Sequence, residues 1–427
     1  MERSSAPRAR RALSMLFLVL AGESIFLPPF HPGRYFKSSL LATFDMSEFQ
    51  LGQLGAIYGA FAMGAYVLGG PLADRFSPRK LIALSLVATG LGSLYMSSIP
   101  SFRGLTVLFG FWGLSTILLF WAPLIRATRE WGGADGQGRA FGILDGGRGL
   151  AAALIAAAAV AAFGVLVGGE AVLDPAREAS AVRVLLAGYG GVCLLVAVGA
   201  WLFVPEPARA PTVAEAPPEQ GVVQRIGLVL RLPAVWLMAL VIIAAYSAFK
   251  MFDNYGLYTE DAYGLTRAGS AQLIAGLSFL RLVAALAAGW IADRVGVART
   301  IRWAFLTLVA TYGIFLVAPP REALVGLIVA NMAVSCAAFF ALRGIYFALL
   351  EESAIPRAVT GTAVGVACFV GFTPEIFMPL VTGYLITHAR DAGDVLVGYD
   401  QIFAILAGLV LTGAVATTIL DRLGRRR

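Results

Sequence analysis

The sequence predicts an all-α polytopic membrane protein, with twelve transmembrane helices in two pseudo-symmetric six-helix bundles. Composition is the first reason: of 427 residues, 59% are hydrophobic and 14% are charged, against about 25% charged in ordinary soluble domains. The second is that apolar runs of about 20 residues, long enough to cross a bilayer, alternate with short charged segments. The third is an internal repeat. This composition excludes a disordered chain, a nucleic-acid-binding domain and an ordinary cytosolic enzyme.

The apolar runs define the twelve helices in order. The first follows four arginines and continues to about Phe30, so we interpret it as an uncleaved signal anchor. The runs of the first half are 12–30, 49–72, 81–99, 104–125, 139–167 and 182–204. Those of the second half are 233–252, 269–292, 301–318, 322–349, 359–387 and 400–420. Within the eleventh run, Pro374 predicts a kink.

A connector rich in Pro, Ala and Glu separates the two sets of runs. Its composition is typical of a flexible linker. We therefore predict an N-terminal bundle over residues 1–204, a cytoplasmic linker over 205–232 and a C-terminal bundle over 233–427.

The orientation follows from the Lys and Arg residues outside the spans. With the N-terminus inside, 21 of them lie in inner segments and 8 in outer segments. The positive-inside rule then predicts that both termini are cytoplasmic. We expect a multi-pass protein of the inner (cytoplasmic) membrane.

Two short motifs recur at nearly the same spacing along the chain. Gly-Pro-Leu-Ala-Asp-Arg at 70–75 ends the second run, and Gly-Trp-Ile-Ala-Asp-Arg at 289–294 ends the eighth. Gly138 and Gly361 open the fifth and eleventh runs, and their separation is nearly that of the two aspartates. The halves are therefore predicted to be parallel repeats about an axis along the membrane normal.

The stretch from Gly70 to Lys80 resembles the loop between helices 2 and 3 of the major facilitator superfamily. That pattern is Gly, three residues, Asp, Arg or Lys, then Gly and basic residues; here Ser77 replaces the second glycine. Glycine allows close helix crossing, and the charges can cap a helix N-terminus or form a breakable pair. We therefore predict gating roles for Gly70, Asp74, Arg75, Gly289, Asp293 and Arg294. The segment from Trp121 to Arg139 more weakly resembles helices 4–5 of organophosphate and other organic-anion carriers.

Charged residues inside the spans are the most informative, because a charge in hydrocarbon is costly unless it faces a cavity or a partner. In the family resembled, helices 1, 2, 4, 5, 7, 8, 10 and 11 line the central cavity, and these charges fall on helices 1, 5, 7, 8, 10 and 11. The residues predicted to bind substrate are Arg148, Arg281, Arg343, Lys250, Tyr58 and Tyr346. Those predicted for ion coupling or ion pairing are Glu23, Asp145 and Glu375.

Internal pairing is the alternative for some of these charges. Asp145 with Arg148, and Lys250 with Asp253, are spaced i,i+3 and could neutralise each other. Arg281 has no acid within one turn of its own helix, so it needs a partner on another helix or a ligand.

These features together predict a secondary active transporter of a small solute, working by alternating access as a symporter or antiporter. The sequence has no phosphate-binding GxxxxGK[ST] loop, which argues against ATP as the driving force. Arginines in the spans favour an organic anion. A proton-coupled sugar or drug transporter, and a non-transporting solute sensor of the same fold, remain open. We expect no enzymatic activity, cofactor, metal site or nucleic-acid partner, and a monomer in the lipid bilayer with the proton as a candidate coupling ion.

Overall fold

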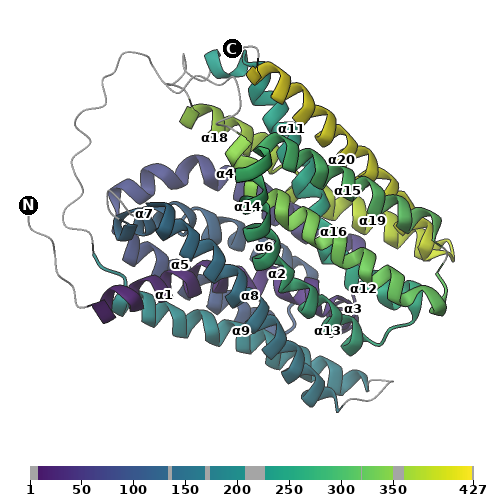
Figure 1. The fold of residues 1–427 in the computed structure, drawn as a ribbon. Coiled ribbons are helices and arrows are strands. Elements are labelled where there is room, and N and C mark those ends of the chain that lie inside the picture. Colours follow the sequence, from purple (N-terminus) through teal and green to yellow (C-terminus); the bar gives the residue numbers. More distant parts are fainter. Residues whose placement is uncertain are drawn as a thin grey trace, which may run out of the picture. The chain divides into compact units, whose positions relative to one another are not determined.

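The computed structural model describes residues 8–132, 137–168, 174–206, 227–318, 320–349 and 360–425, and every regular element in these ranges is a helix (Figure 1). The first half contains α1 (Arg8–Ser24), α2 (Leu27–Tyr35), α3 (Lys37–Phe44), α4 (Glu48–Arg75), α5 (Pro78–Ser97), α6 (Phe102–Ile117), α7 (Trp121–Gly132), α8 (Gln137–Val167) and α9 (Pro175–Phe203). The second half contains α11 (Pro233–Lys250), α12 (Phe252–Tyr263), α13 (Arg267–Ser278), α14 (Leu280–Val295), α15 (Val297–Val317), η1 (Glu322–Leu324), α16 (Val325–Ile345), η2 (Tyr346–Ala348), α18 (Thr360–Gly371), α19 (Pro374–Asp391) and α20 (Val395–Arg425).

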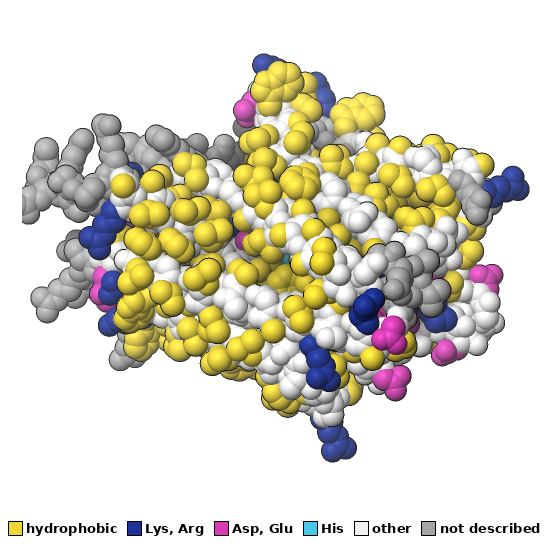
Figure 2. Space-filling view, turned by 90° about the horizontal axis from the view of Figure 1, so that it is seen from below, with side chains coloured by type: hydrophobic (Ala, Val, Ile, Leu, Met, Phe, Trp, Pro, Cys, Tyr) yellow, Lys and Arg dark blue, Asp and Glu magenta, His cyan; other side chains and the backbone are white. Residues whose placement is uncertain are grey.

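The helices confirm a polytopic membrane protein. Within the described ranges, ten helical spans are long and apolar enough to cross a membrane, and four of these spans each join two of the α-helices given above. There are eleven if α1 and α2, which meet at 57°, form one more span. The predicted second run coincides with α4, which has 28 residues. Large apolar side chains are exposed on these helices, among them Val107, Val165 and Leu195, and hydrophobic side chains cover much of the face in Figure 2. Such a surface suits lipid and not water.

In the described part of the chain, five of the runs predicted as single helices are divided between two α-helices. The breaks follow Ser24, Ile117, Lys250, Ser278 and Gly371. In the eleventh run α18 ends at Gly371 and α19 starts at Pro374, so the helix is interrupted at the position where Pro374 predicts a kink. Proline has no N–H to donate to the preceding turn, so the ladder stops there.

The start of α4 is fixed by a reciprocal cap. The Ser47 hydroxyl accepts from the Gln50 amide at 3.2 Å, and the Gln50 side chain accepts from the Ser47 amide at 2.9 Å. This capping box satisfies two amides that a helix start leaves without partners. The first turn of α4 therefore has a defined geometry.

Contacts divide the chain into two compact units. Unit 1 comprises residues 1–46, 54–212 and 266–278, and unit 2 comprises 47–53, 213–265 and 279–427. In unit 1, α5 packs along α9, and α1 packs on α8 and α9. In unit 2, α20 packs on α11 and α15, and α14 packs on α16.

Each unit thus includes a short segment from the other half of the sequence. Residues 47–53, at the start of α4, cluster with unit 2, and residues 266–278, which include α13, cluster with unit 1. The predicted domain boundaries at 204 and 233 remain predictions, since residues 207–226 of the linker lie outside the described ranges.

Candidate functional site

Unit 2 contains a buried ion cluster around Lys250, the last residue of α11. Its ammonium lies 3.0 Å from the Asp253 carboxylate on α12 and 3.3 Å from that of Glu375 on α19. Lys250 is 6% exposed and Glu375 is 8% exposed. Two carboxylates therefore hold one cation in the interior, so the predicted i,i+3 pair is present together with a partner 125 residues away.

Tyr246 connects this ion cluster to Arg343. Its hydroxyl donates a hydrogen bond to the second carboxylate oxygen of Glu375. The Tyr246 ring packs edge-on against Phe372, with ring centres 5.2 Å apart, and its own centre lies 5.5 Å from the guanidinium carbon of Arg343. One side chain thus contacts both an acid on α19 and a cation on α16.

Arg343 is partly buried in the last turn of α16. Its guanidinium carbon lies 3.9 Å from the centre of the Phe249 ring. Within the described ranges, no carboxylate lies within ion-pair distance of Arg343. Aromatic faces attract a guanidinium, but they leave its N–H fork available to an anion.

Unit 1 has a second buried ion cluster, around Arg148 on α8. Its Nε donates to the Gly22 carbonyl at 3.0 Å and lies 3.8 Å from the Glu23 carboxylate on α1. Its Nη1 lies 3.5 Å from Asp145, so this predicted i,i+3 pair is also present. The guanidinium carbon also lies 5.4 Å from the Trp121 ring centre. Gly22 leaves room for the arginine, since a Cβ there would lie 2.8 Å from the Arg148 Cδ.

The two clusters use corresponding helices of the repeat with opposite charge placement. In unit 1 the acid Glu23 is on the first helix of its half and the cation Arg148 is on the fifth. In unit 2 the cation Lys250 is on the first helix and the acid Glu375 is on the fifth. The halves therefore share an architecture but not a site chemistry.

Three further residues predicted to bind substrate lie on other elements. Tyr58, on α4, is buried and its hydroxyl bonds to that of Thr116 at 2.7 Å. Tyr346 is buried in η2 and packs edge-on against Phe347. Arg281 is partly buried at the second residue of α14. Their roles in binding stay predictions.

The predicted gating residues are described only in part. Gly70, Asp74 and Arg75 belong to the last turns of α4, but their side chains lie outside what the structure describes. In the repeat of this motif at 289–294, Asp293 is exposed. The guanidinium carbon of Arg294 lies 3.3 Å from the centre of the Trp290 ring. A Cβ at Gly289 would meet nothing within 4 Å. The gating roles of all six residues stay predictions.

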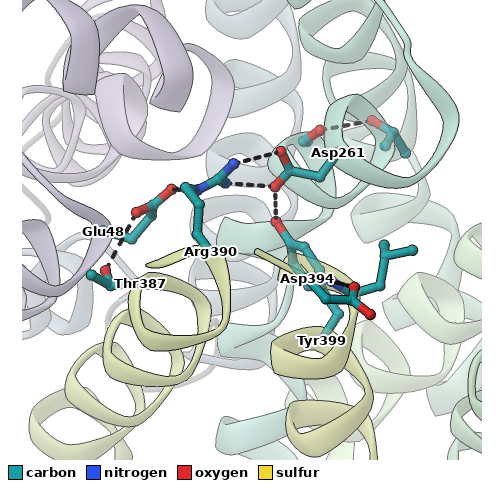
Figure 3. Close-up of polar contacts among 9 residues, drawn as sticks. Glu48, Asp261, Thr387, Arg390, Asp394 and Tyr399 are labelled. Atoms are coloured by element: carbon teal, nitrogen blue, oxygen red, sulfur yellow. Dashed lines mark hydrogen bonds and ion pairs between the residues drawn. The ribbon is translucent and has the colours of Figure 1, made fainter. Parts of the chain in front are cut away.

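A polar cluster that the sequence did not reveal lies in unit 2, where four helices end or begin (Figure 3). Arg390, near the end of α19, forms two hydrogen bonds to Asp261 at 3.1 and 2.8 Å and one through Nε to Glu48 at 3.0 Å. The Tyr399 hydroxyl donates to Asp261 at 2.8 Å. The Thr387 hydroxyl accepts at 2.9 Å from a backbone amide in the first turn of α4. We call this group the Arg390 cluster.

Glycines let α4 and α19 approach closely beside the Arg390 cluster. A Cβ at Gly383 would lie 2.5 Å from the Glu48 carbonyl oxygen, and one at Gly52 would overlap the carbonyl of Pro379. Only glycine fits such an approach.

A related ion pair lies in unit 1. Arg267, the first residue of α13, pairs with the buried Glu178 in the first turn of α9. Along the chain, the separation between Glu48 and Arg267 equals the separation between the repeated aspartates Asp74 and Asp293. Sequence reasoning missed both contacts because these charges lie at span ends, where charges are common. The repeat spacing between Glu48 and Arg267, one residue of each contact, was the available signal.

Comparisons with known proteins agree with this architecture. The Major Facilitator Superfamily model matches residues 12–379. The inner membrane protein YihN of Escherichia coli K12 is 24% identical over 423 residues, covering 96% of this chain and 95% of that protein. YqcE of the same organism is 24% identical over 394 residues, covering 90% and 88%.

Solved structures show the same fold. A bacterial homologue of the human lysosomal transporter Spinster, in an inward-facing and unoccupied conformation, matches with a TM-score of 0.76 at 15% identity, over 98% of both chains. The nucleoside transporter NupG matches with a TM-score of 0.69 at 13% identity, over 96% of this chain and 98% of that one.

Proposed function

Because the chain belongs to the major facilitator superfamily and is a multi-pass membrane transporter, we propose that it carries a small organic anion by secondary active transport. Transport proceeds by alternating access. The relatives YihN and YqcE are named inner membrane proteins, which supports the same membrane for this chain. The predicted cytoplasmic position of both termini is part of this proposal.

The observation that supports the anion proposal is the environment of the Arg343 guanidinium. Arg343 is one of the cations predicted to bind substrate. Its guanidinium lies against the rings of Tyr246 and Phe249, and no carboxylate of the described residues lies within ion-pair distance of it. A guanidinium binds a carboxylate or phosphate through two parallel hydrogen bonds. An anionic substrate would supply the counter-charge that the aromatic rings do not.

Lys250 and Arg148 have different proposed roles. Each is held by carboxylates of its own unit. We therefore assign both to ion pairing, and keep Arg343 as the principal anion ligand. Arg281 remains a predicted substrate contact on α14.

The test is ligand-induced stabilisation of the purified protein. We expect at least one of benzoate, succinate and glycerol 3-phosphate to raise the apparent Tm, while glucose does not. In Arg343→Gln, and also in Arg343→Lys, the shift should fall strongly, because a point charge does not replace the planar fork. Arg299→Gln, which removes an exposed arginine of α15 in the same unit, is the matched control and should keep the shift.

The same proteins reconstituted in liposomes separate a transporter from a sensor. Uptake of the stabilising anion is expected for wild type and Arg299→Gln and not for Arg343→Gln. Stabilisation by glucose without any anion effect would contradict the anion proposal, and binding without uptake would contradict transport.

A further inference from the structure

Asp145 on α8 has an exposed carboxylate although it lies within a membrane span. The apolar part of α8 begins at Ala140, so Asp145 lies about 8 Å into the span at 1.5 Å per residue. Its side chain is 75% exposed. An ionised group at such a position is stable where it faces water and costly where it faces lipid. The direction of this exposed face therefore decides what Asp145 can contact.

The exposed apolar side chains of α8 lie on the other side of the helix. Ile143, Leu150 and Leu154 are all exposed. At about 100° per residue, they lie about 140–180° around the helix from Asp145. Gly142, one turn before Asp145, is also exposed, and a Cβ there would meet nothing within 4 Å. We infer that α8 has an apolar side that suits lipid and a separate side on which Asp145 faces water.

Arg148 places a hydrogen-bond donor beside this carboxylate. Its Nη1 donates to Asp145 at 3.5 Å, which is long against the usual distance of about 2.7–2.9 Å for such charged pairs. The Gly22 carbonyl accepts from Nε at 3.0 Å. The ring centres of Phe26 and Trp121 lie 5.9 and 5.4 Å from the guanidinium carbon. Other groups therefore hold the arginine in place, while its contact with Asp145 is loose.

This carboxylate and guanidinium together match the two hydrogen-bonding functions of a hydroxyl group. An ionised carboxylate only accepts hydrogen bonds, and a guanidinium only donates them. A hydroxyl group bound here donates to Asp145 and accepts from Arg148, so one ligand group satisfies both. An ammonium group has no acceptor and is repelled by Arg148, and a carboxylate is repelled by Asp145. A hydroxyl group therefore fits the pair better than a charge of either sign.

We propose that Asp145 and Arg148 form a subsite for hydroxyl groups of the transported anion, and that the substrate is a hydroxylated organic anion such as a sugar acid or a polyol phosphate. This inference names the substrate class of the anion function proposed above and rests on it. Asp145 is then a specificity-determining residue, because only solutes that carry a hydroxyl group make the contact.

The first experiment compares two pairs of anions whose members differ only in hydroxyl groups. The pairs are gluconate with hexanoate, and glycerol 3-phosphate with propyl phosphate. Titration calorimetry on the purified wild-type protein gives each Kd. We expect at least one hydroxylated member to bind about tenfold more tightly than its partner, the usual effect of one hydrogen bond to a charged group.

The outcomes of this comparison separate the subsite from the proposed function. Equal affinities within both pairs would overturn the subsite and leave the anion function intact. Binding of benzoate or succinate without binding of gluconate or glycerol 3-phosphate would do the same. If none of these anions binds, the proposed function fails, and the subsite fails with it.

Two variants of Asp145 test the residue itself. Asp145→Ala removes the acceptor, and the variant should fold because the side chain is exposed. The ratio of the two Kd values in the discriminating pair should fall to within about threefold of one. Asp145→Asn keeps a neutral acceptor, which is weaker than a carboxylate, so its ratio should fall less but measurably. Glu130→Ala, which removes an exposed acid of α7 in the same unit, is the matched control and should keep the wild-type ratio.

The ratio distinguishes hydroxyl binding from a general effect of charge. Loss of a negative charge near the site raises the affinity of both members of a pair by the same factor, because both are anions. The ratio then stays at its wild-type value. An unchanged ratio in both Asp145 variants, or an equal fall in Glu130→Ala, would therefore overturn the role of Asp145.

Discussion

Arg148 shows at the level of one residue how this protein keeps a charge inside a membrane helix. Its side chain lies across Gly22, bonds to the carbonyl there, pairs with Glu23 and Asp145 and faces Trp121. Each contact removes part of the cost of desolvating a guanidinium. Without these partners, burying the charged side chain inside a membrane helix would carry a large free-energy cost.

Replacing Arg148 should therefore destabilise unit 1, because the buried carboxylate of Glu23 would lose this cation. In Arg148→Met, Glu23 remains 5% exposed and loses the guanidinium beside it. The expected loss is about 3–5 kcal/mol, the usual cost of breaking a buried pair. The measurement is the apparent Tm in detergent.

A second variant separates charge from packing in that loss. Arg148→Met combined with Glu23→Gln removes both charges and should recover most of the lost Tm. If the double variant is as unstable as Arg148→Met alone, packing of the arginine and not charge compensation explains the loss.

At the level of elements, the first turns of α4 and α13 are held by side chains from the other half of the sequence. The Arg390 cluster holds the start of α4, and Glu178 on α9 pairs with the first residue of α13. These segments have few backbone partners of their own, since a helix start leaves its amides free. Their position depends on such contacts.

Gly52 and Gly64, both on α4, give a matched test of close packing. At Gly52 an added methyl group would overlap Pro379, whereas at Gly64 it would meet nothing within 4 Å. Gly52→Ala should cost about 1–3 kcal/mol, and Gly64→Ala should be neutral or stabilise by up to about 1 kcal/mol. Apparent Tm values of the two variants check this, and equal values would show that α4 does not depend on its approach to α19.

The Arg390 cluster predicts a salt-dependent contribution to stability. Arg390→Gln removes a guanidinium that bridges two carboxylates and is 41% exposed in its side chain. We expect a lower apparent Tm at low salt and a smaller difference at about 1 M salt, where the screening length is about 3 Å. Arg183→Gln, which removes an exposed arginine of α9, should show little effect at either ionic strength. A loss independent of salt would assign the role of Arg390 to packing.

At the level of the whole molecule, the distribution of positive charge predicts the orientation in the membrane. The excess of arginine and lysine in alternate loops predicts that residues 205–232 and both termini are cytoplasmic. Reporter fusions after Arg209 and after Arg427 should both give a cytoplasmic signal. A periplasmic signal at either position would invalidate the topology and the assignment of inner and outer loops.

Sequence alone determined the apolar runs, the repeated motifs and the family, because hydropathy and spacing are local properties that can be counted along a chain. It also identified which charges lie in spans, and the two i,i+3 pairs. Tertiary structure decided their other partners: Lys250 meets Glu375 across 125 residues, and Arg390 meets Glu48 across 342. Such pairs depend on which helix faces approach each other, and an apolar run does not fix the rotation of its helix about its own axis. For the same reason the sequence presents Tyr246 as one aromatic among many, and only the fold shows that it contacts both Glu375 and Arg343.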